Sequence, residues 1–484
     1  MAVTISATSG AMQSIIGMTA TNNAAQTATF ASLGLSPAQQ TNLTSLGFDA
    51  LTPIQAATLP LSLAGSDVIA QAKTGSGKTA AFGLALLHNL DPKNVSVQTL
   101  VLCPTRELAD QVCAELRRLA RALDNVKVLT LCGGVALRGQ TASLEHGAHI
   151  VVGTPGRVLD HLQRGNLELK HINTLVLDEA DRMLDMGFAD DIAAVTKHCP
   201  AARQTLLFSA TYPQAIDSMA ARFMRNPKRV QVDTVHEAVT IDEWFYEVSE
   251  TQRLHAVSEL LNHHQPDSTV AFCNTRAQCN DLVEVLRGLG FSALTLHGDL
   301  DQRDRDQVLV QFSNRSCSVL VATDVAARGL DIANLSAVIN VDTTPDPEVY
   351  VHRVGRTGRA GATGKALSLV SMPEMGRVAR IEEQTGRSAR WQDLGKLSTG
   401  NMVFQAPMRT LQIAGGRKEK IRAGDILGAL TGEAGFDKAQ IGKIALGEFS
   451  TYVAIDKVVA QRACDKLNEG RIKGKKVKVR LLDN

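Results

Sequence analysis

The stretch DVIAQAKTGSGKTAAF, residues 67–82, joins a short apolar strand to a helix through a glycine-rich turn. Gly75 and Gly77 allow the backbone to curl so that its N–H groups point at an anion, and the following helix offers its positive amino-terminal end to the same anion. Lys78 can then reach the β- and γ-phosphates of a nucleotide, and the Thr79 hydroxyl can ligate Mg²⁺. Ala72 stands where the usual pattern has its first glycine, and the alternative is a turn with a surface lysine. The stretch predicts a site for ATP and Mg²⁺ formed by Thr74, Gly75, Ser76, Gly77, Lys78 and Thr79.

Strands and helices alternate on the carboxyl-terminal side of this turn. Apolar runs separated by helix-like stretches are typical of a parallel sheet covered by helices on both faces. A first series of runs occupies 67–71, 99–104, 126–131, 149–153, 174–179 and 204–211. After a polar connector at 226–242, a second series occupies 268–274, 292–298, 318–324, 336–342 and 365–371. The sequence therefore predicts an α/β fold with two parallel-sheet domains in tandem.

The end of the chain has a different pattern and a different charge. After a linker at 393–407, the order is strand 409–415, helix 423–432, strands 441–446 and 450–455, helix 458–468 and strand 475–482, which is the split βαβ arrangement. From Phe404 onwards there are 16 Lys and Arg against 9 Asp and Glu, whereas the rest of the chain holds 35 against 40. A basic module on a mildly acidic body indicates a polyanionic partner.

Three carboxylates follow one buried strand in TLVLDEADRML, residues 174–184. Placing Asp178, Glu179 and Asp181 there is costly unless a cation or a reactive group faces them. Beside the nucleotide turn, Asp178 is suited to hold Mg²⁺ and Glu179 to polarise the attacking water as general base. The alternative is an acidic helix start stabilised by the helix dipole, which accounts for Asp181 but poorly for the other two. We predict Lys78, Asp178 and Glu179 as catalytic residues.

Composition excludes several classes of protein. The eight cysteines are scattered without a C-x-x-C pair, which argues against a zinc site and a disulfide framework and fits a reducing cytoplasm. No apolar run approaches the ~18–20 residues of a membrane span. Residues 1–48 contain no Asp, Glu, Lys, Arg or His and therefore lack the basic start of a secretory signal. We expect residues 1–29 to be a disordered tail.

Asp178, Glu179, Ala180 and Asp181 spell the name of the DEAD-box RNA helicases, and the chain from Phe30 to Val370 resembles that family in the order and spacing of its motifs. GFDALTPIQ (47–55) resembles the Q motif, with Leu51 where the family often has Pro. In the first domain, PTRELA (104–109), GG (133–134) and TPGR (154–157) resemble RNA-contacting loops, and SAT (209–211) resembles the motif that couples hydrolysis to unwinding. QRDR (302–305), ATDVAARGLDI (322–332) and HRVGRTGRAG (352–361) resemble the motifs of the second domain. The resemblance implies two RecA-like domains.

The resemblance also implies roles for individual residues. Gln55 reads the adenine edge, Phe48 packs on the adenine ring, and Asp331 accepts a hydrogen bond from the ribose beside Gly329. Arg356 and Arg359, if not ordinary surface charge, stabilise the γ-phosphate and make hydrolysis depend on closure of the two domains. RNA contacts, mainly to phosphates and independent of sequence, are implied for Pro104, Thr105, Arg106, Gly134, Thr154, Gly156, Arg157, Arg305 and Thr323.

Residues 407–484 resemble the RNA-binding domain of the DbpA subgroup of DEAD-box proteins, an RRM-like fold. The resemblance implies large-subunit (23S) ribosomal RNA as partner, at the hairpin called helix 92. The sheet offers only Phe449 and Tyr452, whereas an RRM stacking platform uses two or three rings. The alternatives are solvated faces, or recognition by basic edges and loops that contain Arg417, Lys418, Lys420, Arg471, Lys473, Lys475 and Lys476. Among these we predict RNA contacts for Lys473, Lys475 and Lys476.

The predicted domains are the tail 1–29, an ATP-binding RecA-like domain 30–234, a second RecA-like domain 240–392 and an RRM-like domain 405–484. The predicted function is that of a monomeric cytoplasmic ATP-dependent RNA helicase that remodels ribosomal RNA during ribosome assembly. The same residues would serve an ATP-gated RNA clamp without productive unwinding. A DNA translocase with the same core fits the Q motif and the RRM-like module poorly, and an inactive scaffold fits the complete set of ATP-site residues poorly.

Overall fold

The computed structural model describes residues 3–7, 29–72, 75–211, 214–232, 241–327, 335–358, 363–397, 403 and 405–482. The predicted site residues Thr74, Gly329, Asp331 and Arg359 lie outside the described residues. The chain divides into two compact units. The first unit contains the first predicted sheet, and the second unit contains the second sheet and the C-terminal module.

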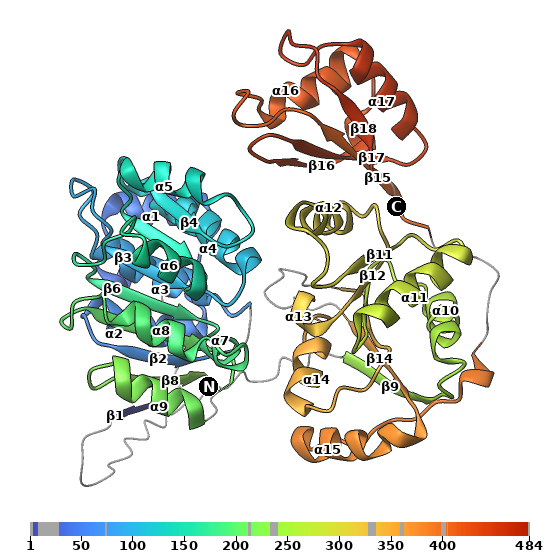
Figure 1. Cartoon of the computed structure of the whole chain (residues 1–484), viewed down its shortest axis with the longest axis horizontal. Helices are drawn as coiled ribbons and strands as arrows, with labels where there is room; N and C mark the ends of the chain where they lie inside the picture. Colours follow the sequence, from blue (N-terminus) through green and yellow to red (C-terminus); the bar gives the residue numbers. More distant parts are fainter. Residues whose placement is uncertain are drawn as a thin grey trace. The chain divides into compact units, whose positions relative to one another are not determined.

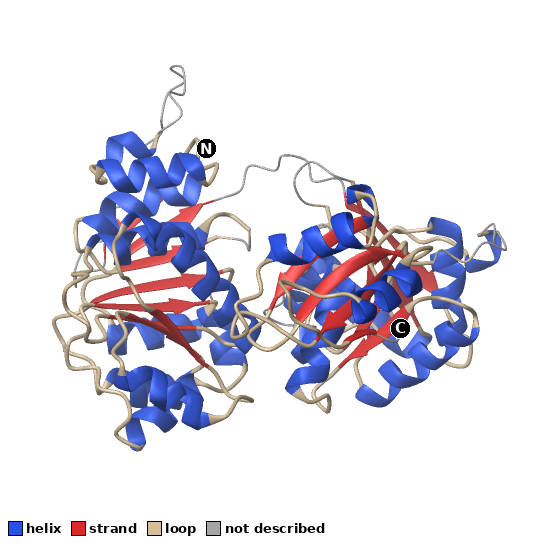
Figure 2. Ribbon diagram, turned by 90° about the horizontal axis from the view of Figure 1, so that it is seen from above, coloured by secondary structure: helices blue, strands red, loops and turns tan. Residues whose placement is uncertain are grey.

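The first unit is built on a sheet with the strand order β1-β8-β2-β7-β6-β3-β5-β4, and helices cover both of its faces (Figures 1 and 2). The strands are β1 Val3–Ala7, β2 Val68–Gln71, β3 Thr99–Leu102, β4 Val128–Leu131, β5 Ile150–Gly153, β6 Thr174–Asp178, β7 Gln204–Ser209 and β8 Lys228–Val232. The helices are α1 Pro37–Ser45, α2 Pro53–Leu63, α3 Lys78–His88, α4 Arg106–Leu119, α5 Leu137–Glu145, α6 Pro155–Gln163, α7 Ala180–Asp185, α8 Ala189–Thr196 and α9 Gln214–Phe223. Neighbouring residues of β6 point into different cores, Val176 into one and Leu175 into the other, which explains the continuous apolar runs.

Two expectations about this unit are wrong. Residues 1–29 were expected to be disordered, but within them Val3–Ala7 forms β1, which pairs antiparallel with β8; residues 8–28 lie outside the described residues. Residues 226–242 were expected to be a connector, but they contain β8, which pairs parallel with β2, and the start of β9. Only Val230 of β8 is fully buried, so its polar neighbours hide the strand from an analysis of apolar runs.

The second unit begins with a sheet in which every pair of strands is parallel and the order is β11-β12-β10-β13-β14-β9. The strands are β9 Ile241–Glu247, β10 Thr269–Phe272, β11 Ala293–Leu296, β12 Val319–Ala322, β13 Ala337–Asn340 and β14 Gly364–Val370. The helices are α10 Arg253–His264, α11 Arg276–Gly288, α12 Gln302–Ser313, α13 Asp324–Ala327, α14 Pro347–Val354 and α15 Met375–Thr385. The prediction of two parallel α/β sheets is confirmed.

The C-terminal module is an antiparallel sheet with the order β16-β17-β15-β18 (Figure 1). Its elements are β15 Met408–Ile413, α16 Ala423–Gly428, β16 Ile441–Leu446, β17 Thr451–Asp456, α17 Ala460–Glu469 and β18 Val479–Leu481. The βαββαβ order is as predicted, although the last strand is shorter than the expected 475–482. Leu411 and Ile413 of β15 join Val453 and both helices in one core, so the helices cover one face of the sheet.

Among the described residues, none of the helices combines the length and the apolar character that crossing a bilayer requires.

Candidate functional site

The glycine-rich turn lies between the end of β2 and the start of α3. Gly75 and Gly77 have φ of 83° and 92°, in the left-handed region that glycine adopts without steric cost. Lys78 is the first residue of α3 and is buried, and its Nζ donates to the carbonyl oxygen of Ala72 at 2.8 Å. The ammonium group is therefore held across the turn, at the place that a phosphate-binding loop requires.

The Q motif is attached directly to this turn. Gln55, in the first turn of α2, accepts a hydrogen bond from Thr52 N at 2.9 Å and donates through Nε2 to the carbonyl oxygen of Gly77 at 3.1 Å. A Cβ on Gly77 would lie 2.5 Å from Gln55 Nε2, so a side chain there would displace the Gln55 amide from its hydrogen bond. Phe48 packs edge-on against the buried ring of Phe30, with 6.1 Å between ring centroids. The structure thus brings Gln55 and the turn together, whereas Phe48 contacts Phe30.

Asp178 ends β6 and is almost fully buried. Burial raises the pKa of its carboxyl to about 7, although the charge of Lys78 acts in the opposite direction. Its Oδ1 accepts a hydrogen bond from Glu179 N at 3.0 Å. A buried carboxylate in this position favours a bound cation. In the glycine-rich turn between β2 and α3, the buried Ser76 Oγ lacks a hydrogen-bond partner among the described residues, so a polar group of a ligand can bind to it. Carboxylate and hydroxyl oxygens, here from Asp178 and Thr79, are the ligands that Mg²⁺ prefers, so the residues present fit this ion.

Glu179 adopts a strained backbone conformation between β6 and α7. Its φ of 53° lies in the left-handed region, which costs about 1–2 kcal/mol for a residue other than glycine. Its side chain is buried, and its Oε2 lies 3.2 Å from Nη1 of Arg182. Strain of this kind is concentrated at functional sites, and it is consistent with the predicted role of Glu179 as general base.

Asp181, the third carboxylate, has a role that the sequence did not reveal. Its Oδ2 accepts hydrogen bonds from Ala210 N at 3.1 Å, Thr211 N at 2.9 Å and Thr211 Oγ1 at 2.9 Å. Burial alone would raise the pKa of Asp181, but the hydrogen bonds from Thr211 prevail and lower it. Asp181 therefore links the acidic cluster to the SAT loop after β7, and stabilisation by the helix dipole is not its main interaction. The sequence signalled this contact only through the SAT motif at 209–211, which follows the apolar run after the one that precedes Asp181.

We expect Asp181→Asn to increase amide hydrogen exchange at Ala210 and Thr211 by about tenfold or more, because hydrogen bonds to a charged acceptor contribute about 1.5–3 kcal/mol. The folded-state pKa of Asp181 is lowered, so its stabilisation is present above the unfolded pKa of about 4 and is lost as the pH falls through the folded pKa. Asp190→Asn, on the exposed surface of α8, is the matched control. Exchange unchanged by Asp181→Asn at pH 7 would contradict the link.

Three predicted RNA-contacting loops of the first unit follow β3, β4 and β5, whose carboxyl ends share one edge of the sheet. Arg106, at the start of α4, lies against Gly133 and Gly134, where any side chain on Gly134 would collide with its guanidinium. Arg157 donates to the carbonyl oxygen of Val135 at 3.1 Å and to Gln140 Oε1 at 2.8 Å. Pro104, Thr105, Thr154 and Gly156 belong to the same two helix starts. The structure therefore groups all of these residues.

Predicted residues of the second unit are grouped around the end of β12. Arg305 of α12 donates to the carbonyl oxygen of Ala326 at 3.4 Å, and the carbonyl oxygen of Thr323 accepts from Ala326 N at 3.1 Å. Arg353, which sequence reasoning missed, is buried in α14 and forms two bonds of 2.7 Å with the carboxylate of Asp324. This pairing fixes the end of α14, from which the predicted site residue Arg356 follows.

In the C-terminal module, part of the helix-free face of the sheet is covered by the preceding domain. Thr410 of β15 is completely buried, and its Oγ1 lies 2.7 Å from Ser316 Oγ and 3.1 Å from Asn314 Nδ2. Lys443 of β16 donates to Ser313 Oγ at 2.6 Å. The one aromatic residue of β15 to β18 is Tyr452, whose hydroxyl accepts from Gln412 at 3.3 Å. Recognition by basic edges is therefore favoured over base stacking across this face.

The basic segments lie at the other end of the same sheet. Lys473 donates to the carbonyl oxygen of Lys420 at 2.7 Å and lies 3.7 Å from the carboxylate of Asp425, so part of its charge is neutralised. Lys475 and Lys476 are exposed. Lys473 is thus a neighbour of the loop 416–420, so the structure brings together the two basic segments that the sequence indicated.

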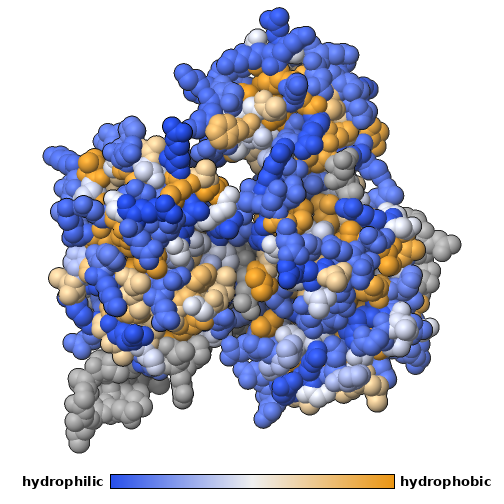
Figure 3. Space-filling view, in the orientation of Figure 1, coloured by the Kyte–Doolittle hydropathy of each residue, from blue (hydrophilic) through white to orange (hydrophobic). Residues whose placement is uncertain are grey.

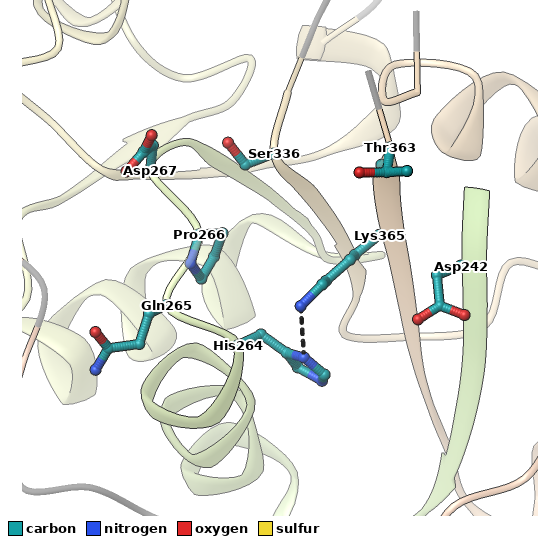
Figure 4. A pocket seen from close by; sticks show the side chains of 9 residues that line it. Asp242, His264, Gln265, Pro266, Asp267, Ser336, Thr363 and Lys365 are labelled. Atoms are coloured by element: carbon teal, nitrogen blue, oxygen red, sulfur yellow. Dashed lines mark hydrogen bonds between the residues drawn. The ribbon is translucent and has the colours of Figure 1, made fainter. Parts of the chain in front are cut away.

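A separate cavity of about 530 Å³ lies in the second unit, at the amino-terminal ends of β10, β13 and β14 (Figure 4). Lys365 Nζ donates to Nδ1 of His264 at 3.2 Å, and burial together with the Lys365 charge lowers the pKa of His264 to about 4. None of the predicted site residues lines this cavity, which also contains Asp242, Gln265, Pro266, Asp267, Ser336, Thr363 and Gly364. It is not part of the sites described above.

Comparisons with known proteins match both parallel-sheet domains and the C-terminal module. Residues 52–219 match the DEAD/DEAH box helicase family, residues 252–361 the helicase conserved C-terminal domain, and residues 410–481 the DbpA RNA binding domain. The chain is 54% identical to the ATP-dependent RNA helicase DbpA of Escherichia coli (strain K12) over 93% of this chain and 98% of that protein. It is 47% identical to the DEAD-box ATP-dependent RNA helicase CshA of Geobacillus kaustophilus over 74% and 77% of the two chains. It is also similar to Dbp5 of S. cerevisiae bound to RNA and ADP BeF3, with a TM-score of 0.69, 31% identity and coverage of 76% and 96%.

Proposed function

The chain belongs to the DEAD-box family of ATP-dependent RNA helicases and carries a DbpA RNA-binding domain, and from this premise we propose that it remodels structured large-subunit ribosomal RNA during ribosome assembly. Family membership favours an RNA helicase over a DNA translocase or an inactive scaffold. A strand-displacement assay with non-hydrolysable ATP distinguishes productive unwinding from the remaining alternative, an ATP-gated RNA clamp. The observation that carries the proposal is the basic C-terminal module, which is hydrogen-bonded to the second RecA-like domain through Thr410 and Lys443.

In the proposed ATP site, the turn around Gly75 and Gly77 and the ammonium of Lys78 bind the phosphates. Thr79 and Asp178 would hold Mg²⁺, which supplies positive charge to the phosphate oxygens when bound. Glu179 accepts the proton of the attacking water. Arg356 of the second unit, with Arg359, neutralises negative charge that develops on the transferred phosphoryl group.

Binding of RNA by the core is proposed to involve phosphates rather than bases. Arg106 and Arg157 lie among glycines and helix starts, and such groups fix the position of a nucleic acid without reading its sequence. Selection of the RNA then belongs to the C-terminal module. Because the module contacts the second domain, an RNA that it binds has a high effective concentration at the core, and a non-specific core acts on one selected site.

We expect deletion of residues 405–484 to abolish the preference for a large-subunit ribosomal fragment containing the hairpin, while stimulation of ATP hydrolysis by bulk RNA persists. The deletion exposes Asn314 and Ser316, which are polar and tolerate water. A full-length variant with Lys473, Lys475 and Lys476 each changed to Gln tests the same point without truncation, and Lys466→Gln on the exposed side of α17 is its control. ATPase stimulation should be measured with the ribosomal fragment and with a scrambled hairpin. A preference that survives the deletion would refute this division of labour.

A further inference from the structure

Phe449 is an aromatic residue that neither the core of the module nor its sheet uses. It lies in the turn between β16 and β17, and 65% of its surface is exposed. On the visible face of the C-terminal module, Figure 3 shows hydrophobic residues surrounded by hydrophilic ones. Exposing a phenylalanine ring to water is unfavourable, so a ring presented at the tip of a hairpin indicates a surface for another molecule.

The turn that carries Phe449 is held rigidly. Its neighbours Gly447 and Glu448 accept hydrogen bonds through their carbonyl oxygens from Arg417 N and Lys418 N, each at 3.0 Å. Gly447 N also donates to the carbonyl oxygen of Ser450 at 2.8 Å. A Cβ on Gly416 would lie 2.5 Å from the carbonyl oxygen of Gly447, so the loop and the hairpin approach as closely as two backbones can. Such a support fixes the position of the ring before any ligand arrives, which lowers the entropic cost of binding.

The same two hydrogen bonds place Lys418 at the ring, in two segments that also contain Glu419 and Glu448. Lys418 Nζ lies 6.0 Å from the centroid of the Phe449 ring, and the side chains of Arg417 and Lys420 are exposed in the same loop. Lys473 joins them through its hydrogen bond to Lys420. An aromatic ring among cations fits a nucleic acid, because a base can stack on the ring while the adjoining phosphates meet the cations.

This cluster lies at the end of the sheet where β15 and β16 end and β17 begins. The domain contacts the module at Thr410 and Lys443, near the start of β15 and β16, whereas the loop 416–420 and the turn 447–450 follow the ends of these strands. Thr410 is the third residue of the six in β15, so about 10 Å of strand separates this contact from the end of β15.

We propose that Phe449, with Arg417 and Lys418, forms a site for one unpaired base of a bound RNA and its adjoining phosphates. The inference rests on the proposed selection of RNA by the C-terminal module, and it names the group that reads an unpaired base there. The stacking base is supplied by the single-stranded loop of a hairpin, because bases within an RNA duplex are already stacked on one another.

The test uses the full-length protein and the ribosomal hairpin, with dissociation constants measured by fluorescence anisotropy at several salt concentrations. Phe449→Ala is expected to weaken binding about 5- to 100-fold with an unchanged salt slope, and Phe449→Trp is expected to retain binding. Lys418→Ala should instead reduce the salt slope by about one ion. On an RNA with abasic loop positions, Phe449→Ala should have no further effect. Val458→Ala is the control, since Val458 is 91% exposed but lies beyond the other end of β17.

Three outcomes overturn the inference. The first is a dissociation constant of Phe449→Ala within twofold of that of the unchanged protein, and the second is full RNA affinity of Phe449→Leu. The third is a loss of affinity in Phe449→Ala that is as large on the abasic RNA as on the intact hairpin. A scrambled hairpin separates this inference from the proposed function. If the unchanged protein binds both hairpins equally, the ribosomal target is wrong, and loss of affinity for both in Phe449→Ala still supports the stacking site. If the unchanged protein prefers the ribosomal hairpin over the scrambled one, and Phe449→Ala binds both with the same affinities as the unchanged protein, only the stacking site is wrong.

Discussion

Glu179→Gln is expected to lower the RNA-stimulated ATPase rate by about 100- to 10,000-fold while ATP and RNA still bind, because an amide of the same shape cannot accept the proton of the attacking water. The nucleotide and the RNA would then remain bound together on an enzyme that cannot complete the reaction. Steady-state ATP hydrolysis and binding of a fluorescent ATP analogue measure the two properties separately.

The buried pair of Glu179 and Arg182 requires its own control. Oε2 and Nη1 are 3.2 Å apart and both side chains are buried, so Glu179→Gln also weakens an ion pair. Arg182→Gln weakens the same pair but leaves the carboxylate in place, and we expect it to retain much more activity. Equal losses in the two variants would assign the effect to the ion pair, and near-normal turnover by Glu179→Gln would exclude Glu179 as the base.

Lys78→Met is expected to weaken ATP binding by about 10- to 100-fold and to reduce turnover by about 100- to 1000-fold. The variant keeps the length of the side chain but removes the ammonium that crosses the turn to Ala72. It also removes the ammonium charge that lowers the pKa of Asp178, which burial has already raised to about 7. The carboxyl then becomes still easier to protonate at neutral pH, so its capacity to bind a cation declines together with phosphate binding.

The comparison for this variant is Lys93→Met, an exposed lysine of the same unit. Titration with a fluorescent ATP analogue should show weakened ATP affinity for Lys78→Met and unchanged ATP affinity for Lys93→Met. The ribosomal hairpin should bind to both variants through the C-terminal module. ATP affinity that survives in Lys78→Met would mean that the turn is a structural feature with a surface lysine, the alternative that the sequence allowed.

Patterns within short segments predicted the order of elements and the nature of the nucleotide site. Eleven of the strands were expected from continuous apolar runs because their sheets are buried on both faces. The turn at 72–79 and the carboxylates at 178–179 were identified because their chemistry is contained in a few consecutive residues. β8 and β9 were missed because they lie towards the edges of their sheets and polar residues interrupt their apolar runs.

Contacts between distant segments were decided only by the tertiary structure. The bond from Asp181 to Thr211, the anchoring of Arg353 by Asp324 and the burial of Thr410 against Asn314 and Ser316 depend on which strands are neighbours and which faces meet. Local periodicity carries no information about such pairings, because it reports only whether a residue is buried and not against what. The sequence by itself determined which chemical groups the nucleotide site contains. The packing of strands within the first unit determined that Asp181 binds the SAT loop, and the contact of the C-terminal module with the second domain determined which surface of the module remains open to RNA.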